Sequence, residues 1–206
     1  MRDVKEPKVR RAEIMEATLF LFMKKGYMHT TTQDIIDKVK ISRGLLYYHF
    51  KNKEDILYCL VERYSEPLLR NLSAISYDKK KSAIEKVRSF IEVTLVSPEA
   101  VTSEMVELQK NVDLEQNRYM MDRFSHNFIE KVTVYFAGII EQGVLEKVFY
   151  VEYPMETAHF LMTGYVFTSN NMNVPHDDIE KADNYLKAFK LLLARTLGAD
   201  ISIFNN

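Results

Sequence analysis

The chain has 206 residues, long enough for one large or two small domains. Its 47% hydrophobic and 28% charged residues are the proportions of an ordinary globular protein. The net charge of −1 does not by itself suggest a nucleic-acid partner. The single cysteine, Cys59, excludes an intramolecular disulfide, and no stretch approaches the length of a transmembrane helix.

The charge is unevenly distributed along the chain. Residues 1–53 carry twelve Lys and Arg against six Asp and Glu, which gives +6 there and leaves −7 on the remainder. A basic segment followed by an acidic one fits a module that binds phosphates joined to a module that does not.

The first expected element is a helix over residues 8–25, in which apolar residues recur at helical spacing from Ile14 to Phe22. Gly26 is placed to end it in the left-handed conformation that often follows a helix. The apolar run over residues 19–23 is too short for the core of a signal peptide, so we expect a cytoplasmic protein.

Residues 30–53, TTTQDIIDKVKISRGLLYYHFKNK, read as two short helices joined by a tight turn and followed by the start of a longer helix. Thr30 and Thr31 are both candidate N-caps of the first short helix, and Thr30 with Gln33 matches a capping box. Ser42 can cap the second. This pattern predicts a helix-turn-helix, whose second helix enters the major groove of DNA.

Side chains of the motif suit this task. Arg43 can donate two hydrogen bonds to a guanine edge, and Leu45 can contact a thymine methyl group. Lys51 and Lys53 lie where a backbone phosphate would pass. The predicted DNA-binding set, within a motif of about residues 31–50, is Thr31, Thr32, Gln33, Ser42, Arg43, Gly44, Leu45, Tyr47, Tyr48, His49, Lys51 and Lys53.

Each of these residues has an ordinary interpretation when it is taken alone. Tyr47 and Phe50 could be core residues, which is the better interpretation of Phe50, and Arg43 and Lys53 could be solvated surface charges. The ordered run as a whole favours DNA binding.

The run also resembles the N-terminal signature of the TetR family of transcriptional regulators. The matching pieces are Lys25-Gly26-Tyr27, Thr31-Thr32, Asp34-Ile35, Ile41-Ser42, Gly44, Leu46-Tyr47-Tyr48-His49-Phe50 and Lys53-Glu54. Lys40 departs from the family, which often has glycine there, and it is expected to hold a less favourable backbone angle. The resemblance implies a DNA-binding domain, residues 1–53, and a regulatory domain, residues 54–206.

Beyond the motif, helix signals recur and strand signals are almost absent. A fourth helix is expected from Lys53, capped by Asn52, with a kink or break at Pro67 and a loop over residues 76–81. Five further helices are expected to begin at Ser82, near Pro98, near Leu114, near Pro154 and at Asp177. Gly143 and Gly198 are expected to end the seventh and ninth. The prediction is therefore an all-α fold of nine helices, which is also the family's layout.

The last two helices are amphipathic and close in sequence. Pairing them with a second copy would make a four-helix bundle, and the resemblance likewise implies a homodimer through helices 8 and 9. Tyr165, Phe167, Phe189 and Leu193 are the residues expected at this interface, and intramolecular packing is the alternative for each.

The resemblance further implies a small effector bound among helices 4 to 8, whose binding releases DNA. The predicted ligand-binding set is Met105, Leu108, Met121, Phe124, Phe128, Met162 and Tyr165. Methionine and aromatic side chains form adaptable apolar cavities, so the expected effector is small and apolar. Core packing is the alternative interpretation, and it extends to Met120 in the same stripe.

No Gly-rich phosphate loop, nucleophile elbow or Cys/His metal cluster is recognisable in the sequence. We therefore expect no catalytic residue, no metal and no cofactor. The predicted function is a dimeric, ligand-responsive repressor that binds a palindromic DNA operator. One alternative is a DNA-binding regulator whose C-terminal domain contacts a protein partner and binds no effector, and another is an enzyme on a helical scaffold.

Overall fold

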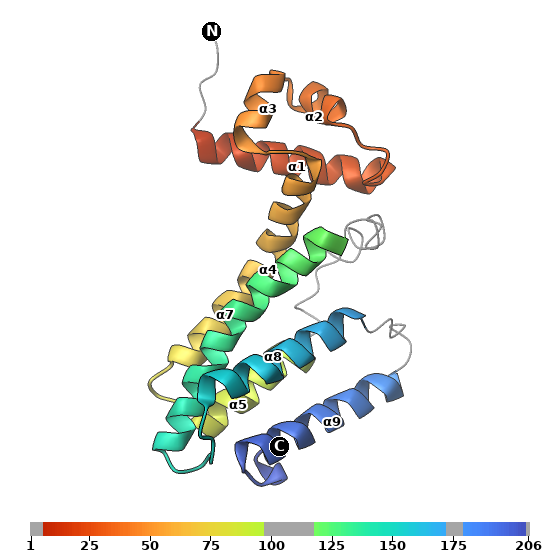
Figure 1. Ribbon diagram of the computed structural model, residues 1–206. Coiled ribbons are helices and arrows are strands. Elements are labelled where there is room, and N and C mark those ends of the chain that lie inside the picture. Colours follow the sequence, from red (N-terminus) through yellow and green to blue (C-terminus); the bar gives the residue numbers. More distant parts are fainter. Residues whose placement is uncertain (1–5, 97–117, 172–178, 205–206) are drawn as a thin grey trace. The chain divides into compact units, whose positions relative to one another are not determined.

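A computed structural model describes residues 6–96, 118–171 and 179–204. Within these residues the regular secondary structure is helical and no strand is present, which confirms the all-α class (Figure 1). The helices are α1 (Pro7–Lys25), α2 (Thr32–Val39), α3 (Arg43–His49), α4 (Lys53–Tyr77), α5 (Ala83–Ile91), α7 (Arg118–Leu145), α8 (Pro154–Asn171) and α9 (Ile179–Leu197). The π-helix η1 (Glu92–Val96) follows α5, and the 3-10 turn η3 (Ile201–Phe204) follows α9.

Eight α-helices are thus described, one fewer than predicted, because the expected sixth falls within residues 97–117, outside the described residues. Within the described ranges, no helix combines the length and apolar character that a membrane span requires.

The chain divides into two compact units. Of the described residues, the first holds 6–66 and 118–124, and the second holds 67–96, 125–171 and 179–204. Helices α4 and α7 therefore each contribute residues to both units. The predicted boundary after residue 53 separates a DNA-binding function from a regulatory function. It stays a prediction, because the division into compact units does not test function.

The first unit has a core built from α1, α2, α3 and the start of α4. Its fully buried side chains include Phe22 of α1, Ile35 of α2, Leu46 of α3 and Ile56 of α4. Met120, in the first turn of α7, is 2% exposed and belongs to the same core. The start of α7 is therefore an integral part of this unit.

A kink or a break was expected at Pro67, and helix α4 is continuous through this residue, so there is no break. Proline removes one backbone hydrogen bond, but Leu60 before it and Leu72 after it are fully buried. Burial on both sides can offset a cost of about 3 kcal/mol in a helix interior. The helix also extends through Ser76 and Tyr77, which were expected in a loop.

Helix α7 likewise continues past Gly143, its expected end, to Leu145. Gly143 serves a different purpose, because the buried ring of Phe149 packs directly on it. A Cβ at residue 143 would lie 1.9 Å from Cδ2 of Phe149, so only glycine allows this approach. The Gly143 carbonyl also accepts the Val148 and Phe149 N–H groups, at 2.9 and 3.1 Å.

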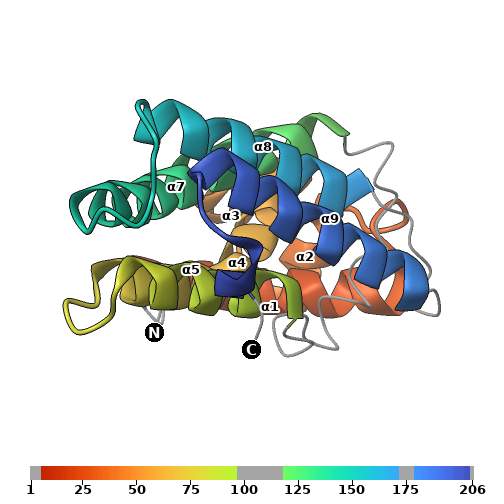
Figure 2. The same ribbon diagram turned by 90° about the horizontal axis from the view of Figure 1, so that it is seen from below.

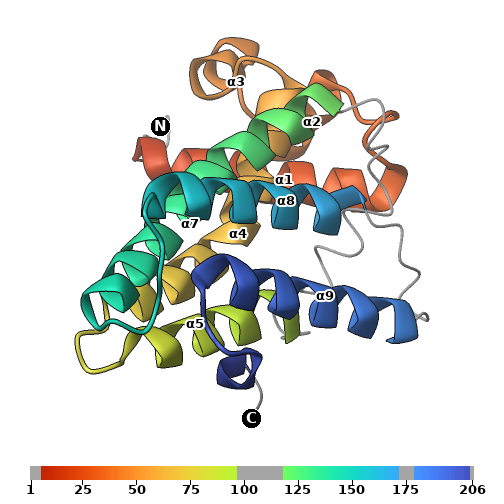
Figure 3. The ribbon, with the colours of Figure 1, turned by 60° about the horizontal axis from the view of Figure 1, so that its bottom comes forward.

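The second unit has its own core, to which α5, α7, α8 and α9 contribute Val87, Phe136, Met162 and Leu193. Helices α8 and α9 run side by side (Figure 1, Figure 3). The C-terminal turn η3 returns to α5 and buries Phe204 in this core (Figure 2).

One charged side chain is buried inside the second unit. Lys86 is 4% exposed and donates to the Ser76 carbonyl at 2.7 Å and to Oε1 of Gln142 at 2.6 Å. Ser76 lies in the last turn of α4, where carbonyls lack a partner within the helix and a cation is favoured by the helix dipole. Lys86 therefore caps α4.

Candidate nucleic-acid interface

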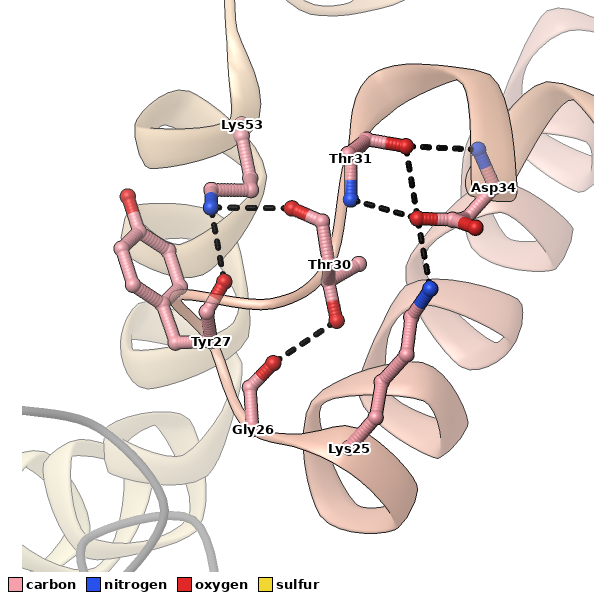
Figure 4. A network of polar contacts seen from close by, with 7 residues as sticks. All are labelled: Lys25, Gly26, Tyr27, Thr30, Thr31, Asp34 and Lys53. Atoms are coloured by element: carbon pink, nitrogen blue, oxygen red, sulfur yellow. Dashed lines mark hydrogen bonds and ion pairs between the residues drawn. The ribbon is translucent and has the colours of Figure 1, made fainter.

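The start of α2 is fixed by a capping box formed by Thr31 and Asp34. Oγ1 of Thr31 accepts the Asp34 N–H at 3.1 Å, and Oδ2 of Asp34 accepts the Thr31 N–H at 2.7 Å (Figure 4). Lys25, the last residue of α1, adds an ion pair of 2.6 Å to the same oxygen. Hydrogen bonding from Lys25, and then from Thr31, holds the pKa of Asp34 well below its usual value.

The expected capping box of Thr30 with Gln33 is therefore wrong by one residue. Thr30 is buried and donates to the Gly26 carbonyl at 2.8 Å, and Gln33 donates to Oδ1 of Asp37 at 2.8 Å. Asp34 has an ionic partner in α1, whereas Gln33 carries no charge, so tertiary structure favours the Thr31 box.

The turn of the motif is closed by Lys40, which adopts the left-handed conformation with φ 57° and ψ 48°. The less favourable backbone angle predicted for this residue is confirmed. Ser42 then begins α3, where its Oγ accepts the Leu45 N–H at 3.2 Å. Asn52 caps α4 as predicted, because its Oδ1 accepts the Asp55 N–H at 2.7 Å.

Helix α3 buries little of its own surface. Leu46 is its one fully buried side chain, and Tyr48 is 73% exposed. Phe50, just after the helix, is buried in the core as predicted. Of the predicted DNA-binding residues, Thr32, Leu45, His49 and Lys53 are half-buried, and Thr31, Gln33, Ser42, Arg43, Gly44, Tyr47, Tyr48 and Lys51 are exposed. A short helix with so few core contacts presents most of its side chains for external recognition.

Arg43 is connected to α2 through Tyr47. The Arg43 guanidinium carbon lies 5.8 Å from the centre of the Tyr47 ring. Hydrogen bonding with the Thr32 side chain, and then with Arg43, lowers the pKa of Tyr47. This chain of contacts gives Arg43 a defined starting position on the exposed face of α3.

Lys53 makes contacts that the sequence did not indicate. Its ammonium donates to the carbonyls of Tyr27 at 2.7 Å and Thr30 at 2.9 Å (Figure 4). The same nitrogen lies 4.1 Å from the centre of the Tyr27 ring. Burial lowers the pKa of Lys53, whereas burial and then the charge of Glu54 raise the pKa of Tyr27 to about 12.

Lys53 therefore joins the start of α4 to the loop that leads into α2. An ammonium has three N–H donors, and two of them are used here. Its contact with a DNA phosphate stays a prediction, as do the DNA contacts of the other residues of the set.

The predicted ligand-binding residues are not gathered in either unit alone. Met105 and Leu108 lie outside the described residues, and Met121 and Phe124 pack against the core of the first unit. Met162 belongs to the core cluster of the second unit, and Phe128, which is half-buried, packs against that cluster. Tyr165, also in the second unit, donates its hydroxyl to the Thr94 carbonyl at 2.7 Å, and its ring centre lies 5.2 Å from that of Phe189.

Two family models match the chain and together cover about two thirds of it. Residues 14–58 match the model described as "Bacterial regulatory proteins, tetR family". Residues 100–192 match the model described as "Tetracyclin repressor-like, C-terminal domain". The first match runs from α1 into α4 and so contains the whole helix-turn-helix.

Similar proteins extend the match over most of the chain. The HTH-type transcriptional regulator YfiR of Bacillus subtilis is 24% identical over 201 residues, which are 93% of each chain. The HTH-type transcriptional repressor KstR2 of Rhodococcus jostii is 27% identical over 152 residues, which are 72% of each chain.

Solved structures share the fold. A TetR-family transcriptional regulator from Pectobacterium atrosepticum aligns with a TM-score of 0.64 at 21% identity, over 93% of this chain and 95% of that one. SmeT, the repressor of the Stenotrophomonas maltophilia multidrug efflux pump SmeDEF, aligns with a TM-score of 0.59 at 19% identity, over 90% of this chain and 89% of that one. The helix-turn-helix, the two family models and the shared fold together establish that this chain belongs to the TetR family of DNA-binding transcriptional regulators.

Proposed function

We propose that this regulator is a homodimeric repressor that binds a palindromic operator and is released from it by a small effector. The observation that carries the proposal is the exposed face of α3, which is capped by Ser42 and presents Arg43 and Tyr48 to solvent. One such helix spans only a few base pairs, so a single copy would bind weakly. Two copies related by a two-fold axis would read two half-sites.

Apolar side chains on α8 and α9 support the proposed dimer. Phe160 is 79% exposed, and Phe167, Tyr185, Leu191 and Leu192 are also exposed. Several exposed apolar residues on two adjacent helices are typical of a surface that another protein covers. We assign these residues to a dimer face on α8 and α9.

The interface residues expected from the sequence are partly replaced by this set. Phe167 is exposed and stays a candidate. Leu193 is fully buried in its own chain, because it faces the core of the second unit rather than solvent. Tyr165 and Phe189 are half-buried and their rings contact each other at a tilt of 34°, so they form intramolecular contacts.

Phe160→Glu is expected to produce a monomer at concentrations where the wild type is a dimer, because a carboxylate would lose its hydration in the proposed apolar interface. Because the variant no longer dimerises, its affinity for the operator should also fall. Sedimentation velocity measures the mass of each species, and Leu145→Glu is a matched control at an exposed residue of α7. A wild-type monomer that binds DNA one-to-one with nanomolar affinity contradicts the dimer.

For the effector, we propose a small apolar compound bound in the C-terminal domain. The effector releases DNA only if it has a higher affinity for the conformation that cannot bind the operator than for the conformation that can. Helices α4 and α7 contribute to both units and are the described elements through which such a preference can act.

The alternative is a C-terminal domain that contacts a protein partner and holds no effector. A thermal-shift screen of apolar and cationic compounds separates the two functions. A ligand at a hundred times its dissociation constant stabilises the protein by about 2.7 kcal/mol. We expect the screen to find a compound that stabilises the protein and also weakens operator binding. A compound that stabilises the protein but leaves operator binding unchanged contradicts the release mechanism.

A further inference from the structure

Arg11 of α1 contacts three segments around the end of the recognition helix. Its Nη1 donates to the backbone carbonyl of His49, the last residue of α3. Its Nη2 donates to Sγ of Cys59 in α4 at 2.9 Å. The guanidinium carbon also lies 4.2 Å from the centre of the Phe50 ring. One planar group thus joins α1, the end of α3 and α4.

The bond to His49 meets a specific need of α3. Carbonyls in the last turn of a helix lack partners within the helix, and a cation there also complements the helix dipole. Because Leu46 is the one fully buried side chain of α3, core packing alone constrains the orientation of the helix weakly. Ser42 caps the first turn, and Arg11 holds the last carbonyl.

We propose that Arg11 is a positioning residue for operator reading, which fixes the C-terminal end of α3 so that Arg43 and Tyr48 face the major groove in one orientation. This inference rests on the proposed reading of DNA by α3. It assigns Arg11 a role in sequence discrimination without a contact to a base. The guanidinium is half-buried and already engaged, so its expected effect is on specificity rather than on phosphate binding.

Arginine suits this position because its planar guanidinium carries two separate nitrogens, Nη1 for the His49 carbonyl and Nη2 for Cys59, whereas a lysine has a single nitrogen. A lysine at residue 11 would keep the positive charge but could not span the His49 carbonyl and Cys59 in the same geometry. Burial raises the pKa of the Cys59 thiol, so that group stays protonated near neutral pH and serves as a neutral acceptor.

The imidazole of His49 senses the charges of both Arg11 and Arg10. Burial, followed by the charges of Arg11 and Arg10, lowers the pKa of its imidazole. Arg10 forms an ion pair of 2.8 Å with Glu13 on the same helix. Replacing either arginine should therefore raise the His49 pKa, whereas only replacement of Arg11 removes the bond to the His49 carbonyl. Arg10→Ala is accordingly the matched control for Arg11→Ala.

The test uses the full-length protein and compares wild type, Arg11→Ala, Arg11→Lys and Arg10→Ala. The affinity for the selected operator is divided by the affinity for unrelated DNA, at several salt concentrations. We expect both Arg11 variants to lower this ratio about tenfold, a change of about 1.4 kcal/mol, with the salt slope unchanged. Arg10→Ala should keep the ratio. Amide exchange of Phe50, whose N–H donates to Leu46 at 3.0 Å, should quicken in the Arg11 variants alone.

Three results would overturn the inference. The first is an unchanged ratio in folded Arg11→Ala, or in Arg11→Lys if the alanine variant does not fold. The second is an equal loss in Arg10→Ala, which would indicate a general charge effect. The third is a loss accompanied by a lower salt slope, which would make Arg11 a phosphate contact. If wild type prefers no sequence, the proposed function fails, and the exchange of Phe50 still tests the contact by itself.

Discussion

Lys53→Ala is expected to lower the free energy of unfolding by about 1–3 kcal/mol, because it removes a hydrogen-bond donor from the backbone carbonyls of two buried residues. Lys53 donates to Tyr27 and Thr30, and both of these residues are buried. The Tyr27 carbonyl keeps one donor, the Thr30 N–H at 3.2 Å, so most of the loss is expected at Thr30. Chemical denaturation of the full-length protein measures the change.

Operator affinity should fall in the same variant, because the loop held by Lys53 leads directly into α2. Lys51→Ala is the matched control. Lys51 is exposed, and its replacement should change stability by less than about 0.5 kcal/mol. It should lower the salt slope of DNA binding by about one for each phosphate contact that is lost. If Lys53→Ala instead keeps its stability and lowers the salt slope, Lys53 is a phosphate contact and not a clamp.

The local features of the motif were predictable from the sequence, because the residues that form them are close together in the chain. Ser42 and Asn52 each cap a helix by accepting the backbone N–H of the residue three positions later in the chain. Lys40 takes the left-handed conformation that the turn requires, although it is not glycine. In each case the required chemistry is contained in a window of a few residues.

The contacts of Arg11 and Lys53 were not predictable in the same way. Arg11 is 38 residues from His49 in the chain, and Lys53 is 26 residues from Tyr27. The partners of both side chains include backbone carbonyls, which every residue has, so no side-chain pattern marks these bonds. Such contacts follow only from the packing of α1 and α4 around the motif.

Two other differences also have tertiary causes. Thr30 and Thr31 were both candidate N-caps, and the ion pair from Lys25 of the preceding helix to Asp34 favours Thr31. Met120 belongs to the stripe from which an effector pocket was predicted, with core packing as the alternative. It lies in the core of the first unit, a position that the apolar pattern of α7 alone does not specify.

Arg43→Ala is expected to remove base discrimination at one position of each operator half-site. Arg43 is exposed at the start of α3 and lies near Tyr47, which hydrogen bonding links to Thr32. A bidentate contact from arginine to guanine contributes about 1–3 kcal/mol of discrimination against the wrong base. Because Arg43 is on the surface, the fold should be unaffected, and the loss should appear only in binding.

The central claim is that α3 reads the operator in the major groove, in two copies related by symmetry. It is tested most directly by measuring the affinity of wild type and Arg43→Ala for the operator and for each of its single-base variants. We predict that the preference disappears at two symmetrically placed base pairs, with the other positions unchanged. A uniform loss of affinity for every sequence, or an operator without two-fold symmetry, would contradict the claim.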